Sequence, residues 1–337
     1  MSARRRMIRR RRGAGFTLVE LMVSLVMFSF AIAGVLAVAV SMANGFREQR
    51  AGVGTEGAAR AAMEFLSDAI RGSSPGTPTG VIWPMDDEDC SDTPGVNLAF
   101  RATMGNATAA DSLTITFAYG SVVTTALSGY DPSSTSGGTI TVEDGSQFQN
   151  GDYVVVTNFE NAVLLKITVS GNTLTYAAKP SACLPTGGWT LGQGALVVRA
   201  LRARFFLQDL DGVPTLFMDP DPTDGVTSDE EPLAEGIEDL QVVLGIDDAT
   251  DGLGAENATV DGDEWWGNLP NESIPTTPSI ALRAVRISLV ARALTKVTGT
   301  AAYFRPALED RDGSLTDNYR RRVLTSIIEV RNMAGSK

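Results

Sequence analysis

The sequence predicts an α+β fold in which one long N-terminal helix precedes a β-rich domain. Three observations predict it. A run of 26 residues, from Leu21 to Phe46, carries no charge. From residue 58 onward, apolar residues recur at three- and four-residue spacing, which is the period of an amphipathic helix. Beyond residue 75, short apolar stretches alternate with Gly, Asp, Asn and Pro, a pattern typical of strands and turns.

Residues 1–15 have the composition of a basic leader. Seven of the 28 basic side chains are arginines within the first twelve residues. The uncharged run would form a helix about 39 Å long, which exceeds the ~30 Å hydrocarbon core of a bilayer. Because basic segments stay on the cytoplasmic side, we expect residues 16–46 to cross the inner membrane once. The part of the chain that follows this helix would then be exported.

Residues 16–72 are expected to form a single long helix whose second half is amphipathic. Three closely spaced glycines, Gly52, Gly54 and Gly57, weaken its middle by about 1 kcal/mol each relative to alanine. The helix should end at Gly72, because Ser73, Ser74 and Pro75 follow. Its apolar face should pack on the globular domain, and it consists of Ala58, Ala62, Phe65, Leu66, Ala69 and Ile70.

Residues 73–337 are expected to form a β-rich head, with a possible β-subdomain at 110–182. One segment, 195–209, is apolar enough to form a buried strand pair. A hairpin is expected at 162–178, with its turn at 170–172, and a long Gly/Asp/Asn/Pro-rich loop at 247–279. The remaining strand candidates are 112–119, 139–145, 151–159, 213–220, 236–247, 281–293 and 320–332.

Composition excludes several classes of function. The 40 acidic side chains lie outside the basic leader, so the head is strongly acidic and nucleic acid is not an expected partner. The chain has no histidine, which removes Ser-His-Asp and Cys-His catalysis and histidine metal sites.

Carboxylates cluster at 209–214, 219–225 and 247–264, and oxygen-rich loops suit Ca²⁺. None has the spacing of an EF-hand, so we read them as solvated turns and expect no metal and no cofactor. A glycosidase would need two carboxylates fixed in one pocket. Because these lie in turns, no catalytic residue is assigned and an enzyme is not expected.

Trp265 and Trp266 end the last acidic cluster. An exposed pair of this kind could anchor a partner or a glycan. The alternative is that both rings pack beneath the loop.

The segment "GFTLVEL", residues 15–21, resembles the processing site of type IV prepilins. A glycine, a phenylalanine and a glutamate five residues past the glycine stand between a basic leader and an apolar helix. The resemblance implies that prepilin peptidase cuts after Gly15 and N-methylates Phe16. It also implies that Glu20 neutralises the new amine of Phe16, in its own or a neighbouring subunit, when helices pack together.

The segments 233–247, 282–293 and 319–332 resemble strands of PilW-type minor pilins, and also the related J-class pseudopilins of type II secretion. Both imply a lollipop shape, with a long helix packed on a β-rich head that contains an antiparallel sheet. The head is long for a pseudopilin, which favours a minor pilin that helps to initiate a type IV pilus, in a tip complex. The alternatives are a J-class pseudopilin and a surface adhesin or ligand-binding subunit.

The expected partners follow from the resemblance. They are other minor pilins and the major pilin through the N-terminal helix, prepilin peptidase, the inner-membrane assembly platform and a tip adhesin. Before assembly the protein would be a single-pass inner-membrane protein with its head in the periplasm. It would then move into the extracellular pilus.

Cys90 and Cys183 are predicted to form a disulfide, because an even pair of cysteines in an exported domain favours one. The bridge would close a loop of about 94 residues, worth about 4–5 kcal/mol in the chain-entropy model. Cys90→Ser should therefore lower the free energy of unfolding by about 2–5 kcal/mol. Peptide mapping under non-reducing conditions checks the pairing, and two free thiols would contradict it.

Overall fold

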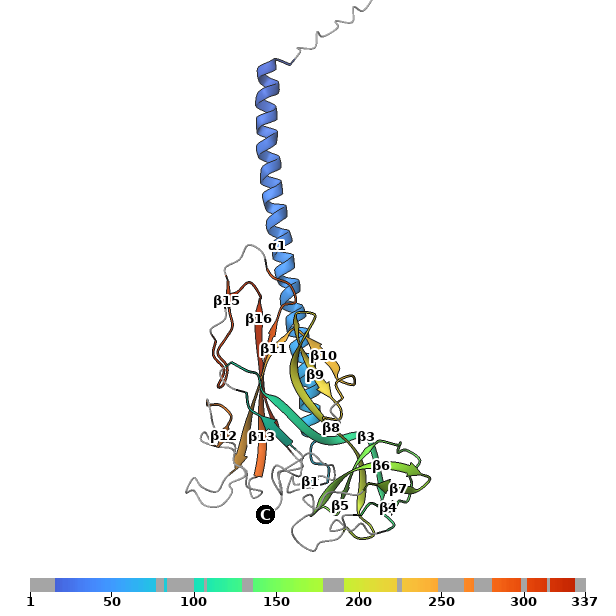
Figure 1. The fold of residues 1–337 in the computed structure, drawn as a ribbon. Coiled ribbons are helices and arrows are strands. Elements are labelled where there is room, and N and C mark those ends of the chain that lie inside the picture. Colours follow the sequence, from blue (N-terminus) through green and yellow to red (C-terminus); the bar gives the residue numbers. More distant parts are fainter. Residues whose placement is uncertain are drawn as a thin grey trace, which may run out of the picture. The chain divides into compact units, whose positions relative to one another are not determined.

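The computed structural model describes residues 16–76, 82–83, 100–105, 108–128, 136–177, 191–222, 226–247, 264–269, 281–297, 302–313 and 316–330. The chain divides into two compact units, residues 1–50 and 51–337. A single helix, α1 (Leu18–Arg71), contributes to both, and all the strands belong to the second unit (Figure 1). The predicted α+β class is therefore confirmed.

Helix α1 is continuous through its three central glycines, although the sequence indicated a weak section there. Tertiary packing explains the difference, because most helical stability in proteins comes from a buried face. Gly52 lies close to the second unit's Arg320, since a Cβ atom at Gly52 would lie 3.3 Å from the guanidinium carbon of Arg320. The buried residues of this half recur at helical spacing: Gly52, Thr55, Ala59, Ala62, Met63, Leu66, Ser67, Ala69 and Ile70.

The C-terminal end of α1 is joined to the sheet by main-chain hydrogen bonds. The N–H of Ser74 donates to the carbonyl of Thr116 (3.0 Å), and the N–H of Ala118 donates to the carbonyl of Gly72 (3.1 Å). These bonds satisfy groups that a helix end leaves unpaired. They fix the last turn of the helix against strand β3.

The larger sheet has ten strands within the described residues. Their order is β10-β9-β8-β5-β6-β7-β4, with β3 beside β8, β2 beside β3 and β1 beside β6. All the pairs are antiparallel except β1 with β6. The strands are β1 (Ile82–Trp83), β2 (Phe100–Thr103), β3 (Ser112–Thr125), β4 (Gly138–Thr141), β5 (Tyr153–Thr157), β6 (Ala162–Ser170), β7 (Thr173–Tyr176), β8 (Leu196–Leu210), β9 (Val213–Asp219) and β10 (Glu231–Glu235).

Strands β5 and β6 separate two hydrophobic cores, which explains why their apolar runs do not alternate with polar residues. Val155 and Leu164 face the core that contains α1, whereas Val154 and Leu165 face a second core. Because successive side chains of a strand point to opposite faces, both faces of these strands are buried. The second core is completed by Ile140, Val142, Phe148, Leu174, Leu191 and Val197.

A second, four-stranded sheet lies toward the C-terminus, in the order β12-β11-β13-β16. Its inner face shares the first core with α1: Leu240, Ile287 and Ile328 are buried there with Leu66. Phe65 of α1 also meets Phe205 of β8 edge to face, with ring centroids 5.9 Å apart. The strands are β11 (Ile237–Asp247), β12 (Trp265–Trp266), β13 (Ala281–Arg292) and β16 (Arg321–Glu329), and β14 (Tyr303–Phe304) pairs separately with β15 (Thr316–Asp317).

Most predicted strands are confirmed, with one correction. The hairpin turns at Gly171 as expected. The sequence Asp211-Gly212 also predicts a tight turn, and these two residues form the turn between β8 and β9, both with positive φ. The segment 195–209 was predicted to be a strand pair, and this was wrong. It forms one strand of 15 residues, β8, because three different strands pair along it: β3, β5 and β9.

Salt bridges hold residues 305–311 against the second sheet. Arg305 and Arg311 both approach the fully buried carboxylate of Asp239, at 2.5 Å and 3.4 Å. Glu309 accepts two hydrogen bonds from Arg286 (3.1 and 2.8 Å). Burying Asp239 without cations would be costly, so these arginines are needed to keep the segment in place.

Asp111 links the two sheets through hydrogen bonds that resemble those between paired strands. Its main-chain N–H donates to the carbonyl of Leu240 (2.9 Å), and its carboxylate accepts the N–H groups of Gly105 (2.6 Å) and Val242 (2.7 Å). Burial raises the pKa of the Asp111 carboxyl to about 6. The two N–H groups oppose that rise, and the nearby Asp310 and Asp239 carboxylates add to it.

The raised pKa predicts a specific pH dependence. The folded protein binds the Asp111 proton more tightly than the unfolded chain does, so protonation of Asp111 stabilises the fold. This stabilisation is full below the unfolded pKa of 3.8 and is lost as pH rises through about 6. Asp111→Asn removes this titration and one of the two acceptors. It should destabilise the protein by about 1–3 kcal/mol at neutral pH, and by about 1 kcal/mol more at pH 5 than at pH 7.5.

Urea unfolding of the detergent-solubilised chain at the two pH values measures this difference. Glu235→Gln, on the exposed edge strand β10, is the control and should leave the pH dependence unchanged. A pH-independent difference between wild type and Asp111→Asn would contradict the assignment.

Candidate functional site at the start of the long helix

Thr17 and Glu20 form a reciprocal cap at the N-terminus of α1. The N–H and the hydroxyl of Thr17 both donate to Glu20 Oε2, at 3.0 and 3.1 Å. In return, the N–H of Glu20 donates to Thr17 Oγ1 (3.2 Å). This is a capping box, with Thr17 as the N-cap and Glu20 at the third helical position.

The role of Thr17 was not predicted, although the spacing Thr-x-x-Glu that signals it is present in the sequence. Glu20 therefore has a local function before any partner is considered: it accepts the N–H and the hydroxyl of Thr17 and places a negative charge at the positive end of the helix dipole. Among the described residues, its second oxygen, Oε1, accepts no hydrogen bond. That oxygen can accept one from a further donor.

The residues on either side of the expected cut stand just before the cap. Phe16 is 78% exposed, whereas Gly15 lies outside the described residues. The capping box uses only atoms from Thr17 onward, so removal of residues 1–15 would leave it intact. Cleavage after Gly15 would create an amine on Phe16, adjacent to Thr17 and within the same helix start as Glu20.

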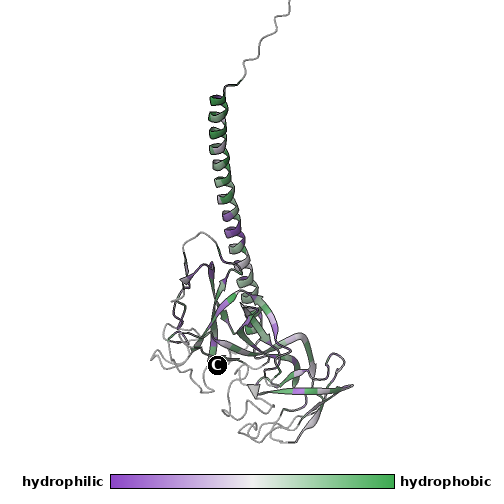
Figure 2. Ribbon diagram, turned by 45° about the horizontal axis from the view of Figure 1, so that its top comes forward, coloured by the Kyte–Doolittle hydropathy of each residue, from purple (hydrophilic) through white to green (hydrophobic). Residues whose placement is uncertain are grey.

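The helix that follows has the length and composition of a membrane span. Its most apolar 18-residue window has a mean hydropathy of 2.5, and none of that window is buried within the protein. Figure 2 colours the ribbon of this half of α1 mostly as hydrophobic. Two hydroxyls within it are satisfied internally, since Ser24 and Ser29 donate to the carbonyls of Glu20 (2.6 Å) and Leu25 (2.8 Å).

The two tryptophans of the head are both partly buried, and each has its own environment. The guanidinium of Arg286 lies 4.8 Å from the centroid of the Trp265 ring, a cation–π arrangement. Trp266 packs against the first core. The idea that they bind a partner remains a prediction.

Several predicted features lie outside the described residues. They are Cys90 and Cys183, residues 223–225 of the second acidic cluster, residues 248–263 of the third, and residues 270–279 of the long loop. The first acidic cluster is described, and it forms the exposed turn between β8 and β9.

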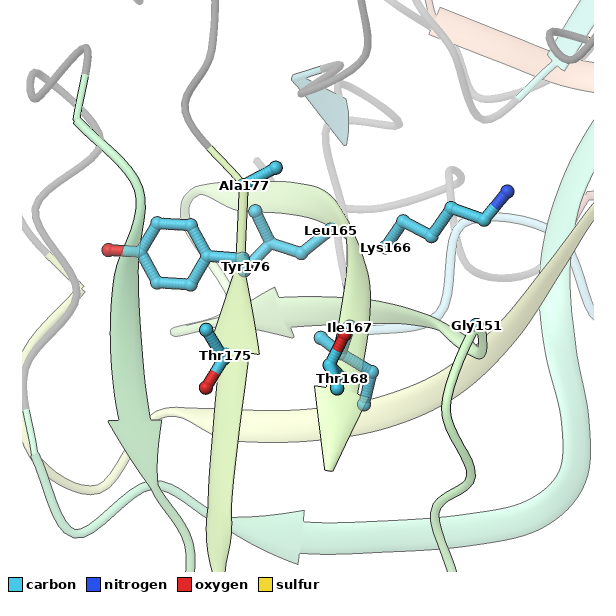
Figure 3. Close-up of a pocket in the computed structure, with 8 residues that line it drawn as sticks. All are labelled: Gly151, Leu165, Lys166, Ile167, Thr168, Thr175, Tyr176 and Ala177. Atoms are coloured by element: carbon cyan, nitrogen blue, oxygen red, sulfur yellow. The ribbon is translucent and has the colours of Figure 1, made fainter. Parts of the chain in front are cut away.

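A cavity of about 420 Å³ lies beside β6 and β7, and Figure 3 shows eight residues that line it. Lys166, the charged residue among them, points its Nζ away from the tyrosine of the cavity and binds Asp221 (2.6 Å). The other carboxylate oxygen of Asp221 accepts the hydroxyl of Tyr153 (2.7 Å). The ammonium is therefore already paired with a carboxylate, and no site is assigned to this cavity. Its lining consists of Gly151, Leu165, Lys166, Ile167, Thr168, Thr175, Tyr176 and Ala177.

Two protein-family models match the chain, one toward each end. Residues 204–332 match the family described as Type IV Pilus-assembly protein W, PilW. Residues 10–40 match the prokaryotic N-terminal methylation motif. The first match runs from β8 to the end of β16, and the second covers Gly15, Phe16 and Glu20. No curated protein and no solved structure matches the chain.

The methylation motif predicts that the mature chain begins at N-methylated Phe16, with residues 1–15 removed. The intact mass of protein extracted from membranes, with sequencing of its first peptide, measures the start. A Gly15→Trp variant should keep its leader, because the cut requires a small residue there. A wild-type chain that retains its arginine-rich leader, or that begins at another residue, would contradict this start site.

Proposed function

Because the chain belongs to the PilW family of type IV pilus-assembly proteins, we propose that it is a minor pilin that helps to initiate the pilus. Members of this family are structural, pilin-class proteins and not enzymes. We further propose that the protein acts in a complex of minor pilins at the pilus tip.

The observation that carries the proposal is the combination of two features in one chain. A methylation motif with Glu20 in the first turn of the helix stands at one end, and the PilW match over the head stands at the other. The exposed apolar half of α1 supports a membrane-anchored subunit before assembly. The same surface would pack against the helices of other pilins afterwards.

In this proposal the chain passes through four stages. The arginine-rich leader stays in the cytoplasm while α1 spans the inner membrane and the head is in the periplasm. Prepilin peptidase cuts after Gly15 and methylates Phe16. The assembly platform then moves the chain into the filament, where its helix meets those of other minor pilins and the major pilin.

Glu20 would then guide helix packing through charge. Its Oε2 is already used by the cap, whereas Oε1 is available to the ammonium of Phe16, in the same or in a neighbouring subunit. In a bundle of low polarity an unpaired charge costs roughly 3–5 kcal/mol. Arrangements that separate the amine from a carboxylate would be penalised, so the pair would select the axial register of the subunits.

A deletion strain tests the proposed function. Loss of surface pili, with normal secretion of folded enzymes, is the expected result. A secretion defect with normal pili would instead identify a J-class pseudopilin. Normal piliation with a loss of attachment would identify an adhesin.

Glu20→Ala should leave membrane insertion and cleavage intact but reduce incorporation into filaments. Insertion should persist because the substitution makes the helix more apolar, and cleavage because the cut lies between Gly15 and Phe16. Incorporation should fall by a factor of about several hundred if the full cost of an unpaired charge applies. The measurement compares processed protein in membranes with protein in sheared filaments.

Glu20→Gln separates the charge from the cap. Glutamine can complete the capping box but cannot neutralise the Phe16 amine, so it should restore incorporation only partly. Ser24→Ala, one turn along the same helix, is the control and should behave as wild type. Wild-type filament levels for Glu20→Ala would show that the charge pair is dispensable in this subunit.

A further inference from the structure

Strand β16 forms an open edge of the C-terminal sheet. It pairs with β13 along all nine of its residues without a register shift, and no other described strand pairs with it. The ladder is flanked by two hydrogen bonds, from the N–H of Ala293 to the carbonyl of Arg320 and from the N–H of Val330 to the carbonyl of Arg283. Both belong to the same antiparallel register.

These flanking bonds show which residues of β16 direct their main-chain N–H and carbonyl groups toward the open edge. Hydrogen-bonded pairs alternate with non-bonded pairs along an antiparallel ladder. Because residues 320 and 330 bond to the β13 side, the even-numbered residues between them do the same. The odd-numbered residues direct their N–H and carbonyl groups to the open edge: Arg321, Val323, Thr325, Ile327 and Glu329.

The side chains at these positions are suited to contact with another strand. Val323 is 42% exposed and Ile327 is 58% exposed, and Thr325 is exposed between them. All three are β-branched, a class that packs well across strand pairs. The outward groups thus combine a row of unpaired main-chain polar atoms with an apolar surface.

Two other edges in the described part of the head carry features that discourage strand addition, whereas β16 contains no proline and has no register shift. Edge strand β10 contains Glu231, Pro232 and Glu235 and has a register shift, each of which discourages pairing. The opposite edge of the second sheet is occupied in part by β12 and in part by Asp111, which binds Leu240 and Val242. Among the described residues, the β16 edge is therefore the edge of this sheet that is open along its length.

We propose that the β16 edge binds an extended strand of a different pilin-class subunit. Arg322, which is exposed, lies near the start of the strand, and Glu329 lies at its end. A partner strand with an acidic residue opposite Arg322 and a basic residue opposite Glu329 matches both ends, and β-branched residues between them match Val323 and Ile327.

The choice of a different subunit rests on the proposed function. Two copies of β16 could pair across a two-fold axis through Thr325, which would place Val323 of each opposite Ile327 of the other. Such an isologous contact closes on itself. A protein that initiates a filament must pass contacts on to other subunits, so we assign the edge to a distinct partner.

A photoreactive residue in place of Val323, in the full-length chain in piliated cells, tests the proposal. The expected result is a crosslink to an extended segment of another subunit that has its own N-terminal methylation motif. The same residue at Leu210, which is exposed on the β8–β9 turn, is the positional control. In the chain that carries the photoreactive residue at position 323, Ile327→Pro removes an N–H that points to the open edge. The yield of crosslink should fall by about tenfold or more. Ile327→Ala keeps that N–H and should retain most of it.

Melting of the detergent-solubilised chain checks the fold of these variants. Ile327→Pro should melt close to wild type, whereas Ile328→Pro removes an N–H bonded to β13 and should melt well below it. A crosslink to a second copy of this chain, no crosslink, or one unaffected by Ile327→Pro would each overturn the proposal. Because piliation of the deletion strain is measured separately, such a failure would not affect the proposed function.

Discussion

One helix has to satisfy two different surroundings, and this constraint organises the whole chain. From residue 52 onward α1 buries one face against two sheets, so its apolar groups have partners within the protein. From Leu21 to Phe46 the helix is apolar on every side and exposed. Those groups need a lipid bilayer or other helices. Charge is consequently confined to the ends of this stretch, with Glu20 before it and Arg47 after it.

The position of Glu20 allows a carboxylate to be tolerated beside an apolar helix. Three hydrogen bonds with Thr17 hold it at the helix start, where the dipole favours negative charge. The proposed pairing with the Phe16 amine would not compete with capping, because the cap uses only Oε2 of Glu20. The cap also fixes the orientation of the side chain before a partner arrives, which lowers the entropy lost on pairing.

Much of the fold follows from local sequence patterns, and the exceptions have long-range causes. Helical spacing and the stop at Gly72 predict α1, and the turn residues Gly171 and Gly212 predict two hairpins. The 15-residue strand β8 was divided wrongly because its length depends on three distant partners. Asp111 was not predicted to be structural, because its acceptor role depends on Val242, 131 residues away. At the candidate site, Gly15, Phe16 and Glu20 came from a motif, whereas the open edge of β16 required the register of its pairing with β13.

The central claim is that this protein is a minor component of the pilus itself. Quantitative mass spectrometry of sheared, purified filaments tests it most directly, with the amount of this chain expressed relative to the major pilin. The account predicts that the chain co-purifies with the filaments at a very small fraction of the major pilin, and that its amount relative to the major pilin falls as the filaments grow longer. A chain that stays in the inner membrane and is absent from the filaments would contradict it.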